Sequence, residues 1–235
     1  MSAFTLRLIA CLAMLIDHIG YQYDIPIFRL VGRIAFPIFV FLLVNGIKHT
    51  SSVQRYALRL GVFAILSQIP FSLFTYGVLW DASGNVFFTL FLALGVLIAM
   101  EQLSQFPLLR WMPAVCLVLC YEFGLLSSTY GARGIILALI FYFAYDQCSG
   151  WPLFMGLGLI LTALYPALTG YFHSGVLQVT QWDLRQMFSL FSLPFLCSYN
   201  GQKGGPSLQS RFLERLLQYG FYAFYPVHQL VLWLL

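Results

Sequence analysis

The chain has 235 residues, of which 60% are hydrophobic and only 9% are charged, and its mean hydropathy is +0.84. Soluble domains carry about 25% charged residues, so this composition excludes an ordinary soluble protein. The formal net charge of +4 is accounted for by membrane topology and gives no reason to expect a nucleic-acid partner. The composition predicts an integral membrane protein.

The apolar stretches are about 20 residues long and lack the two-residue alternation of barrel strands, which indicates transmembrane helices. We expect an all-α polytopic bundle of about nine spans, within a range of about eight to ten, forming a single domain over residues 1–235. In chain order the expected spans cover residues 4–23, 26–47, 57–76, 86–99, 111–126, a sixth that ends near 145, then 151–169, 186–199 and 218–235. Pro70 is expected to break the third span, and residues 170–185 are expected to form a polar loop that contains Asp183.

Basic residues collect in the loops on one side of this arrangement, namely Lys48, Arg55, Arg110, Lys203, Arg211 and Arg215. Cytoplasmic loops of membrane proteins carry an excess of lysine and arginine. The asymmetry therefore predicts a cytoplasmic amino terminus and, with nine spans, a carboxyl terminus on the opposite side.

The first expected span carries Arg7 near its start and the adjacent pair Asp17-His18 towards its end. Ten residues separate Arg7 from His18, which puts both on one helix face about 16 Å apart. An ionisable group inside a bilayer costs about 2.5–3.5 kcal/mol on insertion scales. Three such groups in one span indicate a function.

The depths of the polar residues point to a shared layer in the outer half of the membrane. A rise of 1.5 Å per residue puts His18 about 21 Å into a hydrocarbon core about 30 Å thick, and Arg33 at the same level. On the same count His228 lies near the middle of its span, and three further residues lie at the outer ends of theirs: Asn85, Glu122 and Arg133. Such convergence is typical of a buried reaction or binding site.

Histidine titrates near neutral pH, so His18 is the expected general base of this layer. Neighbours in sequence point about 100° apart on a helix, so Asp17 is expected to pair with Arg29 or Arg33, or to hold His228. An alternative is that Asp17, the arginines and the histidines form a structural ion-pair network between helices.

Arg7 lies where a phosphate group from the cytoplasm would reach it. Acetyl-coenzyme A carries phosphates at one end and its thioester at the end of a thin arm, so a cation and an imidazole about 16 Å apart match its shape. Lys203, in the stretch GQKGGP, and Arg211 and Arg215 would extend the basic patch. The alternatives are a snorkelling Arg7 and a patch that faces lipid.

Eight stretches spread over nearly the whole chain resemble the TraX family. They are AMLIDHIG, RLVGRIAFPIFVFLLVNGIKHT, YALRL, SQIPF, NVFFTL, YGARGIILALIFYF, SLPFLCSYNGQKGG and FYAFYPVHQLVLWLL. The namesake of that family is linked to N-acetylation of a conjugative pilin subunit. The family is also similar to a wider superfamily of transmembrane acyltransferases, which take acetyl groups from cytoplasmic acetyl-coenzyme A.

The resemblance extends to individual residues. The superfamily's basic-residue-x10-His pattern matches Arg7 and His18, and the family's Asp-His pair matches Asp17-His18. Its two arginines match Arg29 and Arg33, and its terminal Tyr-Pro-x-His matches Tyr225, Pro226 and His228.

The resemblance implies an acetyl-coenzyme A-dependent acetyltransferase of the bacterial inner membrane, multi-pass, lipid-embedded and without a metal. The acceptor is an amine or hydroxyl, on a pilin amino terminus, a glycan or a lipid. The expected catalytic residues are His18, Asp17, Arg33, Arg29 and His228, with His18 either taking the proton of the acceptor or transiently carrying the acetyl group. The expected cofactor-binding residues are Arg7, Lys203, Arg211 and Arg215, and the expected substrate-binding residues are Asn85, Glu122, Arg133 and Tyr225.

Two other functions fit the same residues. A proton-coupled transporter would use Asp17, His18 and Arg33 as a relay, and a discontinuous helix at Pro37 would suit it. A non-catalytic pilus assembly factor would use the polar layer for structure alone. Binding of coenzyme A separates the enzyme from the transporter.

Overall fold

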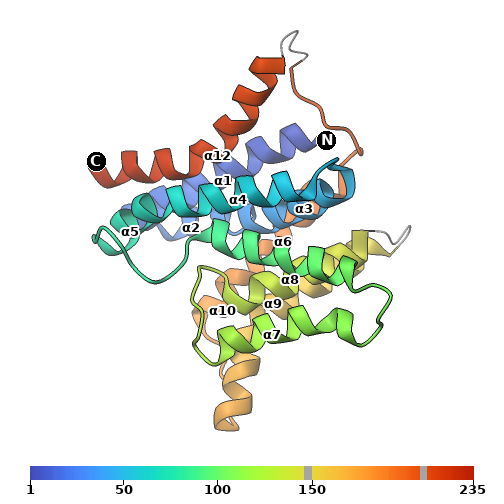
Figure 1. Cartoon of the computed structure of the whole chain (residues 1–235). Coiled ribbons are helices and arrows are strands. Elements are labelled where there is room, and N and C mark those ends of the chain that lie inside the picture. The colour runs from blue at the N-terminus through green and yellow to red at the C-terminus, as the bar shows by residue number, and fades with distance from the viewer. Residues whose placement is uncertain (146–149, 207–210) are drawn as a thin grey trace. The chain divides into compact units, whose positions relative to one another are not determined.

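The computed structural model describes residues 1–145, 150–206 and 211–235, except the side chains of residues 211 and 212 (Figure 1). Within these ranges the regular structure is helical, apart from one isolated parallel bridge between Gly84 and Ser128. The all-α prediction is therefore confirmed.

The chain divides into two compact units, each assembled from two separate segments. Unit 1 comprises Met1–Leu42 and Ile140–Phe224, and unit 2 comprises Leu43–Leu139 and Tyr225–Leu235. Elements of unit 1 are α1 (Ala3–Gln22), α2 (Pro26–Gly32), α9 (Trp151–Ser174), α10 (Gln181–Gln186), the 3-10 helix η2 (Met187–Ser192) and α11 (Leu193–Cys197). Elements of unit 2 are α4 (Val53–Leu66), α5 (Gln68–Tyr76), α6 (Val86–Gln102), η1 (Leu109–Trp111) and α7 (Met112–Glu122). The boundary falls inside α3 (Ala35–His49), α8 (Gly131–Tyr145) and α12 (Arg211–Leu234).

Fewer helices than predicted are long enough to cross a membrane. In the described ranges three segments are sufficiently long and apolar: Ala3–Gln22, Pro26–His49 and Trp151–Ser174. The pair α4 and α5 makes a fourth if its two halves form one span, and α6 and α8 are shorter apolar helices. The count of about nine spans is corrected to three or four by this measure.

The reason for the lower count is that several apolar stretches form short or broken helices. The expected fifth span is α7, which has 11 residues. The expected eighth span is split between η2 and α11, which have 6 and 5 residues. Apolar composition alone does not show where the backbone hydrogen bonds are interrupted.

Two of the interruptions follow from proline. Proline has no N–H, and its ring clashes with the carbonyl four residues before it. Pro37 lies four residues after Arg33, where α2 gives way to α3, and Pro70 lies four residues after Leu66, where α4 ends. The helices α4 and α5 meet at an angle of 41°, which confirms the predicted break at Pro70.

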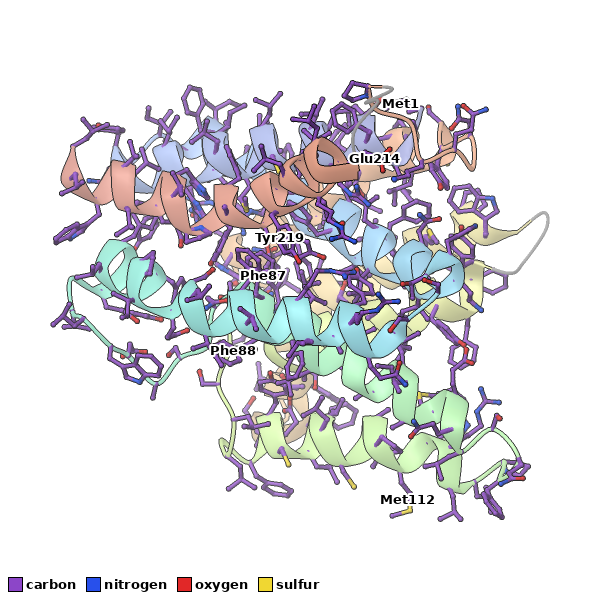
Figure 2. All side chains as sticks on the ribbon, turned by 45° about the horizontal axis from the view of Figure 1, so that its top comes forward. Met1, Phe87, Phe88, Met112, Glu214 and Tyr219 are labelled. Carbon is purple, nitrogen blue, oxygen red and sulfur yellow. The ribbon has the colours of Figure 1, made fainter. Side chains whose placement is uncertain are left out.

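The surface is rich in large apolar side chains, while several polar side chains are buried. Leu12 and Leu58 are 59% and 67% exposed, whereas Asn85 and Thr89 are 0% exposed. Figure 2 shows Met112, at the start of α7, directed away from the neighbouring ribbons. Exposed apolar area of this extent indicates a surface that faces lipid.

Candidate functional site

The site of unit 1 is built on the hairpin of α1 and α2. The turn between them contains Asp24 at a φ of 50°, and the Ile25 N–H donates to Gly20 O at 2.9 Å. Gly20 permits the close approach of the helices, because a Cβ there would lie 2.7 Å from Phe28 Cβ. A Cβ at Gly32 would overlap the Asp17 side chain. The two glycines thus allow α2 to lie directly against the part of α1 that carries Asp17.

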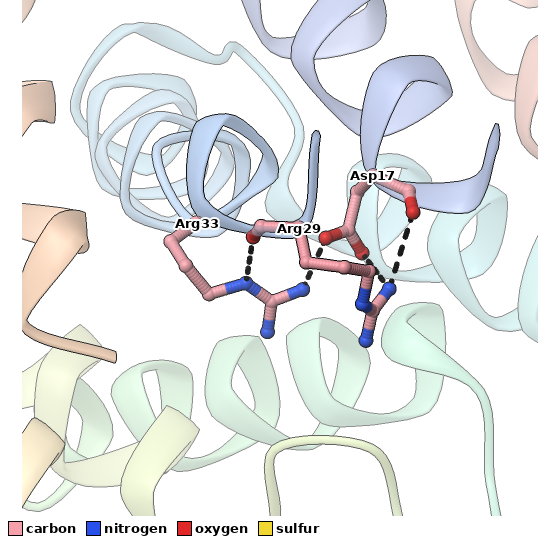
Figure 3. A network of polar contacts seen from close by, with 3 residues as sticks. All are labelled: Asp17, Arg29 and Arg33. Atoms are coloured by element: carbon pink, nitrogen blue, oxygen red, sulfur yellow. Dashed lines mark hydrogen bonds and ion pairs between the residues drawn. The ribbon is translucent and has the colours of Figure 1, made fainter. Parts of the chain in front are cut away.

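Asp17 holds two arginines of α2 in what we call the arginine clamp, defined as Asp17, Arg29 and Arg33 (Figure 3). Arg29 Nη1 donates to Asp17 Oδ2 at 2.7 Å and to the Asp17 carbonyl at 3.2 Å. Arg33 Nη2 pairs with Asp17 Oδ1, and Arg33 Nε donates to the Arg29 carbonyl at 3.0 Å. The predicted pairing of Asp17 with an arginine is confirmed, and it involves both candidates.

The clamp is largely removed from solvent. The side chains of Asp17 and Arg33 are each 12% exposed, and that of Arg29 is 31% exposed. Each carboxylate oxygen of Asp17 is engaged by a different guanidinium group, so Asp17 positions the arginines rather than His18. Charge-assisted hydrogen bonds of this kind are about twice as strong as neutral ones.

His18 and Arg7 lie on the same uninterrupted helix. Helix α1 runs from Ala3 to Gln22 without a break, so the periodicity that aligns the two residues holds over the whole distance. Both side chains are half-buried. His18 follows Asp17 of the arginine clamp directly in the sequence, about 100° further round the helix.

The start of α1 is in contact with the loop that carries Lys203. The Ala3 N–H donates to Gln202 O at 2.9 Å, and the Phe4 N–H donates to Lys203 O at 3.0 Å. These N–H groups belong to the first turn of α1, where backbone N–H groups have no acceptor within the helix. Gly204, at a φ of 61°, allows the approach, because a Cβ there would overlap Ser2. The loop is thereby fixed about one helical turn from Arg7.

A second basic element approaches the same end of α1. Phe221 of α12 contacts Phe4 edge to face, with ring centroids 5.5 Å apart. Arg215 is exposed and precedes Phe221 by six positions on the same helix. Arg211 begins α12, but its side chain lies outside the described part of the chain. The four predicted cofactor-binding residues therefore come from three elements that meet at this end of α1.

The predicted residues of unit 2 lie around a buried amide pair that we call the amide node, defined as Gln68 and Asn85. Asn85 caps α6 through Oδ1, which accepts from the Phe87 N–H at 2.9 Å. Its Nδ2 donates to Ala64 O at 2.7 Å and to Gln68 Oε1 at 3.0 Å. Asn85 thus joins the start of α6 to the break between α4 and α5, and its predicted role in substrate binding stays a prediction.

Gln68 completes the node from the other side of the break. Its Nε2 donates to the carbonyls of Asp81 and Ser83 at 3.0 and 2.9 Å. Gln68 was not among the predicted residues, although it lies two residues before Pro70, where a broken helix leaves backbone groups that need partners. The position of Gln68 shortly before a helix-breaking proline is the feature of the sequence that could have identified it.

Tyr225 and His228 are buried on α12, at 4% and 6% exposure. The Tyr225 ring contacts the Phe87 ring at 5.2 Å and the His228 ring at 5.9 Å. Its hydroxyl hydrogen-bonds the Gln229 side chain and the Val86 backbone at the start of α6. The terminal Tyr-Pro-x-His therefore lies beside the amide node within unit 2.

The two remaining predicted residues lie at helix ends of unit 2. Glu122 is exposed at the end of α7. Arg133 is half-buried in the first turn of α8, with its guanidinium carbon 5.6 Å from the centre of the Tyr130 ring. The predicted layer joins residues of both units and stays a prediction.

The comparisons with known proteins agree on one family. The family model described as TraX protein matches residues 2–235. The probable fimbrial assembly protein FimC, serogroup H1, of Dichelobacter nodosus is 30% identical over 256 residues, which cover 97% of this chain and 92% of that protein. No solved structure matches the chain. The chain belongs to the TraX family.

Proposed function

We propose that this protein is a membrane-embedded acetyltransferase, which moves an acetyl group from acetyl-coenzyme A to an amine or hydroxyl acceptor during the assembly of a pilus or fimbria. The observation that carries the proposal is the unbroken helix α1. One end of α1 bears Arg7 and contacts the loop of Lys203, and the other end bears His18, the residue after Asp17 of the arginine clamp.

The basic end of α1 suits the phosphates of acetyl-coenzyme A. Arg7 and Lys203 supply positive charge, and Arg215 lies on the helix that packs against Phe4. A pantetheine arm bound along α1 would then bring its thioester to the level of His18, because the two residues are separated by about 16 Å of helix. Arginine suits such a site because its planar guanidinium binds phosphate through two hydrogen bonds.

The other end of α1 suits the chemistry of acyl transfer. His18 takes the proton of the acceptor amine or hydroxyl as the new bond to the acetyl carbon forms, and the thiolate of coenzyme A leaves and takes up a proton. Arg33 and Arg29 stabilise the negative charge that develops on the acetyl oxygen. Asp17 is a positioning residue, since its two carboxylate oxygens already hold the arginines.

The same proposal includes location and orientation. We place the protein in the bacterial inner membrane as a multi-pass protein, with Arg7 and the start of α1 on the cytoplasmic side, where acetyl-coenzyme A is available. The relative with fimbrial assembly in its name supports a role at the bacterial envelope, and the apolar helices support a membrane location.

The test is release of coenzyme A by the purified chain in detergent, with pilin, glycan and lipid fractions as acceptors. His18→Gln should lower the rate about 10²–10⁴-fold, because a general base contributes about that factor. The matched control is His173→Gln, since His173 is exposed in the last turn of α9. Equal rates in His18→Gln and the control would contradict the proposal.

A second candidate function is a non-catalytic assembly factor. It is favoured by the name of the FimC relative and by the arginine clamp, which is also a structural ion-pair network between α1 and α2. Complementation of a deletion strain separates the two functions. An assembly factor restores pili with His18→Gln as well as with the unchanged chain, provided that the variant is present in the membrane at the same level.

A further inference from the structure

A line of buried polar side chains runs along α10 and η2 in unit 1. The polar residues recur at every third position, and we call them the polar stripe: Asp183, Gln186, Ser189 and Ser192. A 3-10 helix has 3.0 residues per turn, so residues three apart lie along one edge, and on an α-helix they share a face. All four are buried, with Asp183 at 1% and Ser192 at 0% exposure.

Three large side chains between them are apolar and exposed, and Arg185 is exposed as well. Leu184, Phe188 and Phe191 are 56%, 38% and 63% exposed. The helix therefore turns its polar edge inward and its apolar edge outward, which is the reverse of a helix on the surface of a soluble protein. An apolar exterior with a polar interior is typical of a membrane segment beside a polar site.

Asp183 was expected in a polar loop, and the structure instead buries it at the start of α10. Its Oδ2 accepts from the N–H and the hydroxyl of Thr180, both at 2.7 Å. Its Oδ1 is buried without a hydrogen-bond partner in the part of the chain that the structure describes, and so is the hydroxyl oxygen of Ser192. Among the same residues no cation pairs with Asp183.

We propose that Asp183 binds a monovalent cation such as Na⁺, with the side-chain oxygen of Gln186, one turn further along α10, as a neighbouring ligand. A buried carboxylate costs several kcal/mol unless its charge is compensated, and a neutral ligand that only donates hydrogen bonds would leave the charge in place. Carboxylate, amide and hydroxyl oxygens are the ligands that hard cations prefer.

The charge of the stripe favours a monovalent over a divalent ion. Asp183 is its one carboxylate, and the searched residues contain no group of three or more His, Cys, Asp or Glu side chains that would hold a metal. A single carboxylate neutralises one positive charge, so a divalent ion would leave a net charge in a medium of low dielectric constant. The cation site does not depend on the proposed acetyl transfer.

The test measures thermal unfolding of the full-length purified chain in detergent. Samples contain Na⁺, K⁺ or Li⁺ as chloride, or choline at equal ionic strength as the large cation that does not fit. At a tenfold excess over the dissociation constant, one of the small cations should raise the midpoint by about 3–6 °C relative to choline. Equal midpoints in all four salts would overturn the proposal.

Two variants locate the effect. Asp183→Asn keeps a side-chain oxygen that accepts hydrogen bonds from Thr180 but removes the negative charge. The cation-dependent shift of the midpoint should therefore disappear. Asp24→Asn, at an exposed turn, should keep the shift in full. If Asp183→Asn does not fold, Gln186→Ala tests the same site, because it should raise the cation concentration that gives half of the shift. A shift that is unchanged in these stripe variants, or one produced by Ca²⁺ alone, would contradict a monovalent site at Asp183.

Discussion

The arginine clamp of unit 1 and the amide node of unit 2 are both buried polar clusters, and they differ in charge. The arginine clamp of unit 1 joins a carboxylate to two guanidinium groups between α1 and α2. The amide node of unit 2 joins neutral amides and backbone carbonyls at the break between α4 and α5. Both lie beside a helix interrupted by proline, namely Pro37 in one case and Pro70 in the other.

The difference separates two uses of buried polarity. Neutral amides satisfy the backbone groups that a broken helix exposes, and this use is structural. A carboxylate that holds two arginines brings two guanidinium groups together, and in the proposed acetyl transfer these stabilise the oxyanion. Under that proposal the arginine clamp takes part in the chemistry, whereas the hydrogen bonds of the amide node stabilise the fold of unit 2.

The largest effect on stability is expected at Asp17. Asp17→Asn leaves two guanidinium groups without their carboxylate, and removal of one partner of a buried pair costs about 3–5 kcal/mol. We expect a loss of about 3 kcal/mol, at the lower end, because the Arg29 side chain is 31% exposed. The measurement is the free energy of unfolding in detergent by chemical denaturation.

The matched control for that prediction removes the whole clamp. Neutral apolar side chains of similar length at positions 29 and 33, as in Arg29→Met with Arg33→Met, should recover most of the stability lost in Asp17→Asn, because no unpaired charge remains. The same triple variant should not recover release of coenzyme A. Recovery of both would assign the clamp to structure alone.

A smaller loss is expected at the amide node. Asn85→Ala removes the cap of α6 and the side-chain donor to Ala64 O, while Gln68 Oε1 keeps only the backbone N–H of residue 85 at 3.3 Å, and these losses together cost about 2 kcal/mol. The unfolding free energies of Asn85→Ala, Gln68→Ala and the double variant measure the coupling of the pair. The double variant should lose less than the sum of the single losses by about 1 kcal/mol, and exact additivity would contradict the node.

The sequence was informative where a residue type is rare in its surroundings. Ionisable residues stand out within an apolar span, so Asp17, Arg29 and Arg33 were selected and their pairing was predicted correctly. The break at Pro70 was also predicted correctly, because proline has no N–H and disfavours the continuation of the helix that precedes it. The number of spans was not predicted correctly, because the length of each helix depends on breaks such as the change from α10 to η2. Hydropathy does not show where such breaks lie.

Several neutral members of the amide node and the polar stripe were missed for a related reason. Gln68, Ser189 and Ser192 belong to residue types that occur anywhere in a membrane protein, and their burial depends on which helix packs against them. Asp183 was assigned to a loop because residues around it are polar, although the three-residue spacing from 183 to 192 was visible in the sequence. Polar residues at every third position are recognised as one helix edge only when a 3-10 helix is expected. Such helices are seldom longer than four residues, so none was expected here.

The smallest effect is expected from a neutral hydrogen bond at the edge of unit 2. Thr89 Oγ1 lies 2.9 Å from Ser128 Oγ, and Ser128 Oγ also lies 2.8 Å from the Tyr121 hydroxyl. Thr89→Val keeps the shape and removes one hydroxyl, so the unfolding free energy should fall by about 1 kcal/mol or less, because Ser128 retains its second partner. A loss as large as that of Asn85→Ala would mean that capping a broken helix adds nothing beyond an ordinary hydrogen bond. The structural use of amides at the break would then need another explanation.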